Sequence, residues 1–190
     1  MAFWTEAPDR DPKRNFRFRV LIAGLQNGNT APASSVWWAK KIAKPNFTVA
    51  ESKHVYLGHT FYYPGKVEWQ AISMTLVDPV SPGSLARLNN IVINSGYVVP
   101  GNENTLFTQS KPKAVGAIGG VTIEQLDGNG NRVEQWVLKN PFIKSYKMSD
   151  LDYENDDLST IDIEFRYDWA VCESQDGLAR FPAFEAFANS

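Results

Sequence analysis

Twelve residues near the C-terminal end, TIDIEFRYDWAV (160–171), alternate between apolar and polar side chains. Successive side chains on a β-strand point to opposite faces, so the pattern predicts one long strand with an apolar and a polar face. The apolar face would consist of Ile161, Ile163, Phe165, Tyr167, Trp169 and Val171. The polar face would consist of Thr160, Asp162, Glu164, Arg166 and Asp168. We therefore expect Ile163, Phe165 and Trp169 in the core.

Three further stretches indicate strands. Residues 16–24 (FRFRVLIAG) alternate, with phenylalanines, valine and isoleucine on one face and arginines on the other. In residues 66–78 (KVEWQAISMTLVD) the apolar parity changes midway, which indicates a bulge or a strand that passes from one sheet to another. Residues 121–140 predict a hairpin, because DGNGN supplies residues that tolerate positive φ.

One helix is expected at about 81–95. Ser81 can cap it, Pro82 suits its first turn, and Gly96 can end it. The expected fold is mainly β, an antiparallel barrel or sandwich of two sheets with this one flanking α-helix and extended terminal arms. We expect an N-terminal arm at 1–14, one β domain at 15–173 and a C-terminal arm at 174–190.

Composition excludes several classes of protein. The 190 residues are 43% hydrophobic and 21% charged, which is typical of a globular domain and too apolar for disorder. The formal net charge of −2 provides no basic excess for nucleic acid or anionic membranes. A single cysteine, and a chain without an apolar signal segment or membrane-length run, indicate a soluble protein with no membrane anchor, used without secretion.

Seven carboxylates stand between positions 150 and 164 with no basic residue among them: Asp150, Asp152, Glu154, Asp156, Asp157, Asp162 and Glu164. The first four alternate like calcium-loop ligands, but Asn155 replaces the glycine of the sharp turn and Ile161 replaces the closing glutamate. A glycosidase-like acid pair also lacks support, since nothing in the sequence raises the pKa of one member. An acidic turn in solvent is the favoured interpretation.

Other candidates for chemistry are few. His54 and His59 have no further histidine or cysteine nearby to complete a zinc site, and Cys172 has no neighbouring histidine to activate it. We expect no catalytic residue, no metal and no cofactor. The adjacent pairs Trp37–Trp38 and Tyr62–Tyr63 place one ring on each face of a strand, which indicates a sheet buried on both sides or a subunit interface.

Three segments together resemble the tail tube protein of contractile-tailed, myovirus-type bacteriophages. They are KPNFTVAE (44–51), HTFYYPGKVEWQAISMTLVDPVSP (59–82) and WVLKNPFIKSYKMSDLDYENDDLSTIDIEFRYDWA (136–170). The resemblance covers most of residues 16–172 and extends to the haemolysin-coregulated protein of type VI secretion, which shares the tube fold. The two terminal arms lie outside it.

The resemblance implies a β-barrel subunit without enzymatic activity that forms hexameric rings, which stack into a hollow tube conducting DNA. Its partners would be other copies of itself and the tail sheath, baseplate and tape-measure proteins. It would be part of the virion tail, assembled in the host cytoplasm. A baseplate tube-initiator or a contractile secretion-system tube protein of the same fold is the nearest alternative. Outside the family, a β-barrel that binds single-stranded nucleic acid stays open, with Lys40, Lys41 and Lys44 beside the tryptophan pair.

A channel wall that bound DNA would hold the DNA inside the tube. We therefore expect that DNA passes along the wall without specific binding. The candidate lumen-facing residues are Glu124, Asp162, Glu164 and Asp168. Alternatively, Arg17 and Arg19 pair across strands with Asp162 and Glu164. The candidate subunit-interface residues are Phe3, Trp4, Trp37, Trp38, His54, His59, Tyr62, Phe181, Phe184 and Phe187. By resemblance, the stretch 45–66 should reach the neighbouring ring.

Overall fold

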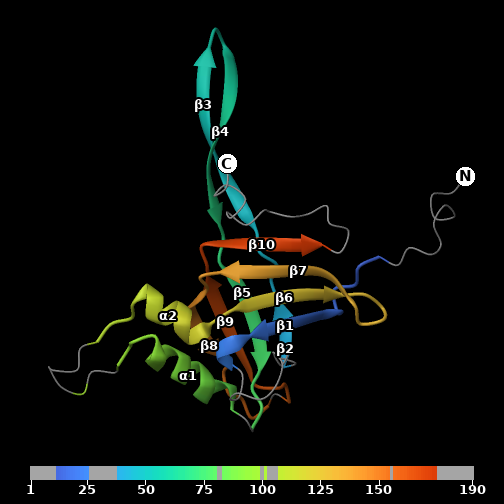
Figure 1. The fold of residues 1–190 in the computed structure, drawn as a ribbon, viewed down its shortest axis with the longest axis vertical. Coiled ribbons are helices and arrows are strands. Elements are labelled where there is room, and N and C mark those ends of the chain that lie inside the picture. Colours follow the sequence, from blue (N-terminus) through green and yellow to red (C-terminus); the bar gives the residue numbers. More distant parts are fainter. Residues whose placement is uncertain are drawn as a thin grey trace, which may run out of the picture.

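The computed structural model describes residues 12–25, 38–80, 83–98, 101, 107–154 and 156–174. Sheet A has the strand order β1-β6-β7-β10, and sheet B has the order β2-β5-β9-β8. All pairings in both sheets are antiparallel, and each described sheet has two open edges, so the protein is a sandwich and not a closed barrel. The mainly β, antiparallel prediction is confirmed. Figure 1 shows the strands of sheet A running across those of sheet B.

The elements have the following bounds. Sheet A contains β1 (Phe18–Ile22), β6 (Val121–Leu126), β7 (Arg132–Lys139) and β10 (Trp169–Ser174). Sheet B contains β2 (Ala39–Ile42), β5 (Ile72–Val77), β9 (Thr160–Arg166) and β8 (Phe142–Met148). A separate hairpin consists of β3 (Phe47–Tyr56) and β4 (His59–Trp69). The helices are η2 (Ala23–Leu25), α1 (Ser84–Asn94) and α2 (Lys111–Ile118).

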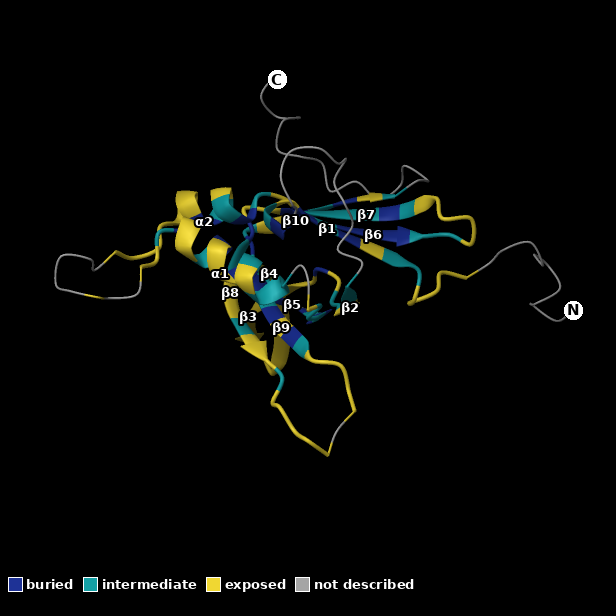
Figure 2. Ribbon diagram, turned by 90° about the horizontal axis from the view of Figure 1, so that it is seen from below, coloured by how far each residue is buried: buried dark blue, intermediate teal, exposed yellow. Residues whose placement is uncertain are grey.

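The core lies between the two sheets. Sheet A contributes Val20, Ile22, Ile123 and Leu138, and sheet B contributes Ile72, Met74, Leu76, Ile161, Ile163 and Phe165. Phe165 is among the largest fully buried side chains, with 1% of its surface exposed. The predicted core positions Ile163 and Phe165 are therefore confirmed. Buried segments of the strands appear dark blue in Figure 2.

The predicted strand 160–171 is wrong in its second half. The chain leaves sheet B after Arg166 and enters sheet A at Trp169, so β9 and β10 belong to different sheets. At the turn, the backbone N–H of Asp168 donates to the carbonyl of Lys139 at 3.0 Å. The parity then reverses, because Ala170 and Cys172 face the core while Trp169 is 45% exposed. Two small apolar residues thus take the inward positions that the larger side chains were expected to fill.

Of the predicted strand 16–24, only Phe18–Ile22 is a strand, and Phe16 is 75% exposed before it. Two other predicted strand features are confirmed. The parity change within 66–78 marks a passage between sheets: β4 ends at Trp69, and β5 begins at Ile72 in sheet B. The hairpin at 121–140 forms β6 and β7, and Asp127 accepts the backbone N–H groups of Asn129 and Asn131 in its turn.

The expected helix is present, and a second one was missed. Helix α1 begins at Ser84, whose backbone N–H donates to the Asp78 carboxylate at 3.0 Å, and Gly96 follows its end with φ +101°. Helix α2 has Pro112 in its first turn and Gly116 inside it, so its sequence lacks a helical signal. It ends at Gly119 with φ +68°, where an added Cβ would come within 2.8 Å of Ala23 Cβ. The expected caps Ser81 and Pro82 lie outside the described residues.

Candidate functional site

Asp162 and Glu164 lie on the outward side of sheet B, as their parity predicts. The Thr75 hydroxyl donates to Asp162 at 2.6 Å, and Lys144 Nζ lies 2.8 Å from Glu164 Oε1. The hydrogen bond from Lys144 lowers the pKa of Glu164 more than its slight desolvation raises it, and Ser145 adds to the lowering. Neither acid pairs with Arg17 or Arg19 in the way considered from sequence, because β1 belongs to the other sheet.

This outward side carries charges of both signs. The register across the four strands places Lys41, Thr75, Asp162 and Lys147 in one row. The adjacent row contains Ser73, Glu164 and Ser145. Thr75 stands between Lys41 and Asp162, whereas Asp162 and Lys147 are direct strand partners. No large apolar residue stands in these two rows. The surface is polar, but it is not a purely acidic wall.

Glu124 and Asp168 lie elsewhere. Glu124 is on the outward side of sheet A, only 4% exposed, and its Oε2 accepts from Arg19 Nε at 2.6 Å. Asp168 lies at the turn between β9 and β10. Burial raises the pKa of Asp168, but hydrogen bonds from Lys111 and Asn140 outweigh this and lower it. The structure therefore separates the four candidate lining acids into three locations.

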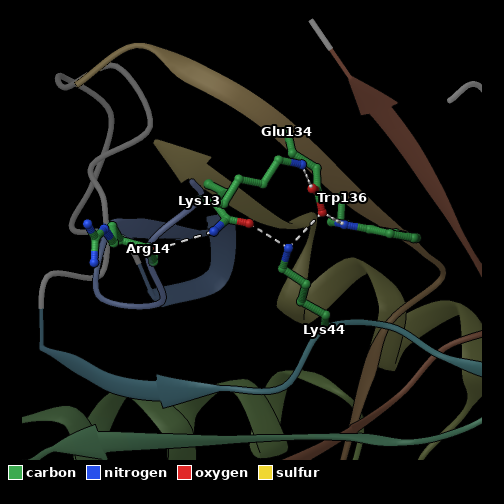
Figure 3. Close-up of polar contacts among 6 residues, drawn as sticks. Lys13, Arg14, Lys44, Glu134 and Trp136 are labelled. Carbon is green, nitrogen blue, oxygen red and sulfur yellow. Dashed lines mark hydrogen bonds and ion pairs between the residues drawn. The ribbon is translucent and has the colours of Figure 1, made fainter. Parts of the chain in front are cut away.

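A cluster of hydrogen-bond donors that the sequence did not predict surrounds the single carboxylate of Glu134 on β7 (Figure 3). Lys13 Nζ lies 2.6 Å from Glu134 Oε2, and Lys44 Nζ lies 2.8 Å from Oε1. The indole N–H of Trp136 also donates to Glu134. Burial alone raises the pKa of Glu134, but the hydrogen bonds from Lys13, Lys44 and Trp136 outweigh it and lower the pKa to about 2.

The Glu134 cluster connects separate parts of the chain. Lys44 also donates to Gln125 Oε1 at 2.6 Å, and Gln125 Nε2 donates to the carbonyl of Arg14 at 3.3 Å. Residues 13–14 and the segment that leads from β2 into the hairpin are thereby attached to sheet A. A sequence signal existed: Glu134 shares the inward parity of Trp136 and Leu138, and a carboxylate at an inward position needs a partner.

The β3–β4 hairpin extends away from the body of the sandwich (Figure 1). Every residue of β3, and every residue of β4 except Trp69, is exposed. Tyr62 and Tyr63 are 60% and 55% exposed, so this tyrosine pair is not in a sheet buried on both sides. Leu57 and Gly58 both have positive φ and form the turn.

The other interface candidates are divided between described and undescribed parts of the chain. His54, His59 and Tyr62 all lie on the hairpin. Trp38 is half-buried just before β2, and its carbonyl accepts the N–H of Val77 at 2.9 Å. The remaining candidates, Phe3, Trp4, Trp37, Phe181, Phe184 and Phe187, lie outside the described residues, as does most of both arms.

The described part of the chain offers few side chains that could form a catalytic or metal site. Among the residues that the structure describes, no three histidine, cysteine or carboxylate groups gather closely enough to hold a metal ion. Cys172 is buried, which raises its thiol pKa and disfavours a reactive thiolate. The segment 150–154 and 156–159 is exposed, with the Asp152 carboxylate accepting the Glu154 N–H at 3.0 Å. No described helix is both long and apolar enough to cross a membrane.

Comparison with known proteins gives structural matches only. Neither a protein-family model nor a curated protein matches the sequence. A chain in the cryo-EM structure of the PVC sheath/tube terminator of an extracellular contractile injection system matches with a TM-score of 0.60 at 15% identity, covering 87% of this protein and 99% of that chain. A chain in the six-fold symmetrised anti-feeding prophage baseplate matches with a TM-score of 0.59 at 15% identity, covering 87% and 97%. An Hcp protein matches with a TM-score of 0.50 at 13% identity, covering 84% and 93%. The resemblance noted from sequence is confirmed at the level of the fold.

Proposed function

We propose that this protein is the structural subunit of a contractile tail tube, without enzymatic activity. The observation that carries the proposal is the structural match of 87% of this chain with 97% and 99% of two chains from contractile injection systems. In this proposal six copies form a ring, rings stack into a hollow tube, and the tube conducts DNA from a phage capsid. The tube would be part of the virion tail, assembled in the host cytoplasm, with sheath, baseplate and tape-measure proteins as partners.

Two features of the described chain support self-assembly. Both sheets have open edges, at β1 and β10 and at β2 and β8, whose backbone groups can pair with strands of another copy. The hairpin exposes aromatic and aliphatic side chains that gain nothing from water, including Phe61 and Val67. A tube-initiator of the baseplate is a second candidate, because one matching chain comes from a baseplate structure.

Sedimentation of the purified full-length protein tests the proposal. The expected result is ring-sized or polymeric species whose proportion rises with protein concentration. A protein that remains strictly monomeric at high concentration in several buffers would contradict it.

We further propose that the outward side of sheet B faces the channel. A channel wall remains in water after assembly, and the rows that contain Asp162 and Glu164 are polar throughout. The outward side of sheet A instead carries a partly buried row of Leu21, Thr122, Val137 and Val171, which another protein could cover. Of the four candidate lining acids, the proposal keeps Asp162 and Glu164.

Replacing Asp162 and Glu164 by lysine should leave assembly intact and make the tubes retain DNA. Exposed ion pairs contribute little to stability, so loss of the Lys144–Glu164 pair should be tolerated. DNA retention should be visible at low salt and should disappear as salt rises, because salt screens lysine–phosphate contacts. The measurement is co-sedimentation of tubes with double-stranded DNA over a salt series.

Glu173→Lys provides the control for this experiment. Glu173 is exposed on the outward side of sheet A, so tubes of this variant should not retain DNA inside the channel. Equal retention by both variants, or failure of the double variant to assemble, would overturn the assignment of the channel wall to sheet B.

A further inference from the structure

The two sides of the β3–β4 hairpin differ in chemistry. Residues paired across an antiparallel ladder share a side, and alternate pairs point to opposite sides. One side, which we call the histidine side, carries Ser52, His54, Tyr56, His59, Phe61 and Tyr63. The opposite side carries Glu51, Lys53, Val55, Thr60, Tyr62 and Pro64.

On the opposite side, the charged residues interact with each other within the hairpin. Lys53 Nζ lies 3.8 Å from Glu51 Oε1 and 5.6 Å from the centre of the Tyr62 ring. The histidine side has three exposed aromatic rings, with exposed fractions of 61% for Tyr56, 47% for Phe61 and 55% for Tyr63. It also carries both histidines of the chain and no carboxylate. A side rich in exposed rings and poor in charge is the better docking surface.

A second exposed segment connects β8 to β9; we call it the acidic loop (149–159). It contains Asp150, Asp152, Glu154, Asp156 and Asp157, with no lysine or arginine. Three apolar side chains within it are strongly exposed, at 91% for Leu151, 109% for Tyr153 and 71% for Leu158. The described part of the loop is drawn as exposed in Figure 2. Apolar side chains among carboxylates suit a surface that offers aromatic rings together with N–H groups that donate hydrogen bonds.

The hairpin and the acidic loop leave sheet B at opposite ends. Strands β5 and β9 pair from Ile72↔Phe165 to Val77↔Thr160. The hairpin ends at Trp69, close to the Ile72 end, and the acidic loop ends just before Thr160, at the Val77 end. In Figure 1 the hairpin points upward from the sandwich, while β8 and β9 connect at its lower end. One copy therefore cannot bring these two surfaces together within itself.

We propose that the histidine side of the hairpin docks against the acidic loop of a second copy in the adjacent ring. The inference rests on the proposed tube and specifies which two surfaces make contact between rings. A contact between two different surfaces at opposite ends of a subunit does not close on itself, so it repeats as an open stack. Imidazole N–H groups donate to carboxylates, and the rings of Tyr56, Phe61 and Tyr63 pack on the apolar side chains of the loop.

Two negative charges introduced on the hairpin test the docking. His54→Glu with His59→Glu places two carboxylates against the acidic loop, and the concentration needed for polymerisation should rise about tenfold or more. The matched control is Val55→Glu with Thr60→Glu, which adds the same two charges one residue away on the opposite side and should polymerise like the wild type. Adding Asp152→Lys and Asp156→Lys to the histidine variant should restore polymerisation. Circular dichroism of unassembled protein checks that each variant is folded.

The outcomes separate this inference from the proposed function. A wild-type protein that never polymerises would overturn both. If the wild type polymerises, the docking is overturned when the histidine variant polymerises equally well, when both hairpin variants lose polymerisation to the same extent, or when the lysine substitutions fail to restore it. Selective loss on the histidine side with restoration by the lysines would support the docking.

Discussion

Replacing Phe165 by alanine should lower the free energy of unfolding by about 3–5 kcal/mol, because the substitution removes a buried ring and leaves a cavity that the core cannot fill. Phe165 is 1% exposed and lies on the face of sheet B that packs against sheet A. Its strand partners are Ile72 on β5 and Ile143 on β8, so the cavity would lie among elements on both sides of β9. Chemical denaturation of the unassembled protein, monitored by circular dichroism, measures the change.

Trp169→Ala is the matched control for Phe165→Ala. Both residues are aromatic, and simple alternation along 160–171 places them on the same face. In the structure the chain changes sheets between them and Trp169 is 45% exposed, so its removal should cost about 1 kcal/mol or less. If the two variants lose similar amounts of unfolding free energy, the change of parity at Tyr167–Asp168 is contradicted. If Phe165→Ala leaves the free energy of unfolding unchanged, the assignment of Phe165 to the core is contradicted.

Glu134→Gln should lower the free energy of unfolding by about 1–3 kcal/mol at pH 7, and this difference from the wild type should disappear in strong acid. The pKa of Glu134 is lowered from 4.5 to about 2 in the folded protein. A depressed folded-state pKa contributes stability that is complete above the unfolded value and is lost as pH falls through the folded value. The wild type should therefore lose its advantage over the variant between pH 4.5 and about 2.

Water around the two lysines limits the stability that the Glu134 ion pairs contribute. The Lys13 and Lys44 side chains are 51% and 49% exposed, so water screens both ion pairs and can solvate both amines when the carboxylate is removed. Glu164→Gln, at an exposed pair with Lys144, is the control and should change stability much less. Denaturant midpoints measured from pH 7 to pH 2 make the comparison. Parallel pH profiles for wild type and Glu134→Gln would show that the cluster does not stabilise the fold.

Sequence patterns predicted strands well where one face is apolar and the other polar. The alternation in β9, the parity change before β5 and the DGNGN turn each specify local geometry, and the structure has all three. The passage from β9 to β10 could not be predicted in this way. Ala170 and Cys172 carry a weak apolar signal, whereas Trp169 and Val171 carry a strong one, so the pattern appeared to continue after the chain had changed sheets.

Candidate surfaces were harder to predict because they depend on which strands become neighbours. Asp162 and Glu164 face outward as expected, but their partners Thr75 and Lys144 come from β5 and β8, which only the sheet order identifies. Glu124 has a polar side chain at an outward position and is nevertheless buried, although its partner Arg19 is exposed. Helix α2 escaped detection because a short segment with proline and glycine depends on packing for its stability.

Electron microscopy of the purified full-length protein tests the tube assignment most directly. At concentrations where sedimentation detects assembly, the protein should form rings or long hollow fibres with six-fold symmetry in end views. The Asp162→Lys/Glu164→Lys variant should give fibres of the same diameter. Fields that contain only particles of monomer size at every concentration, or assemblies without a central channel, would contradict a tail tube subunit.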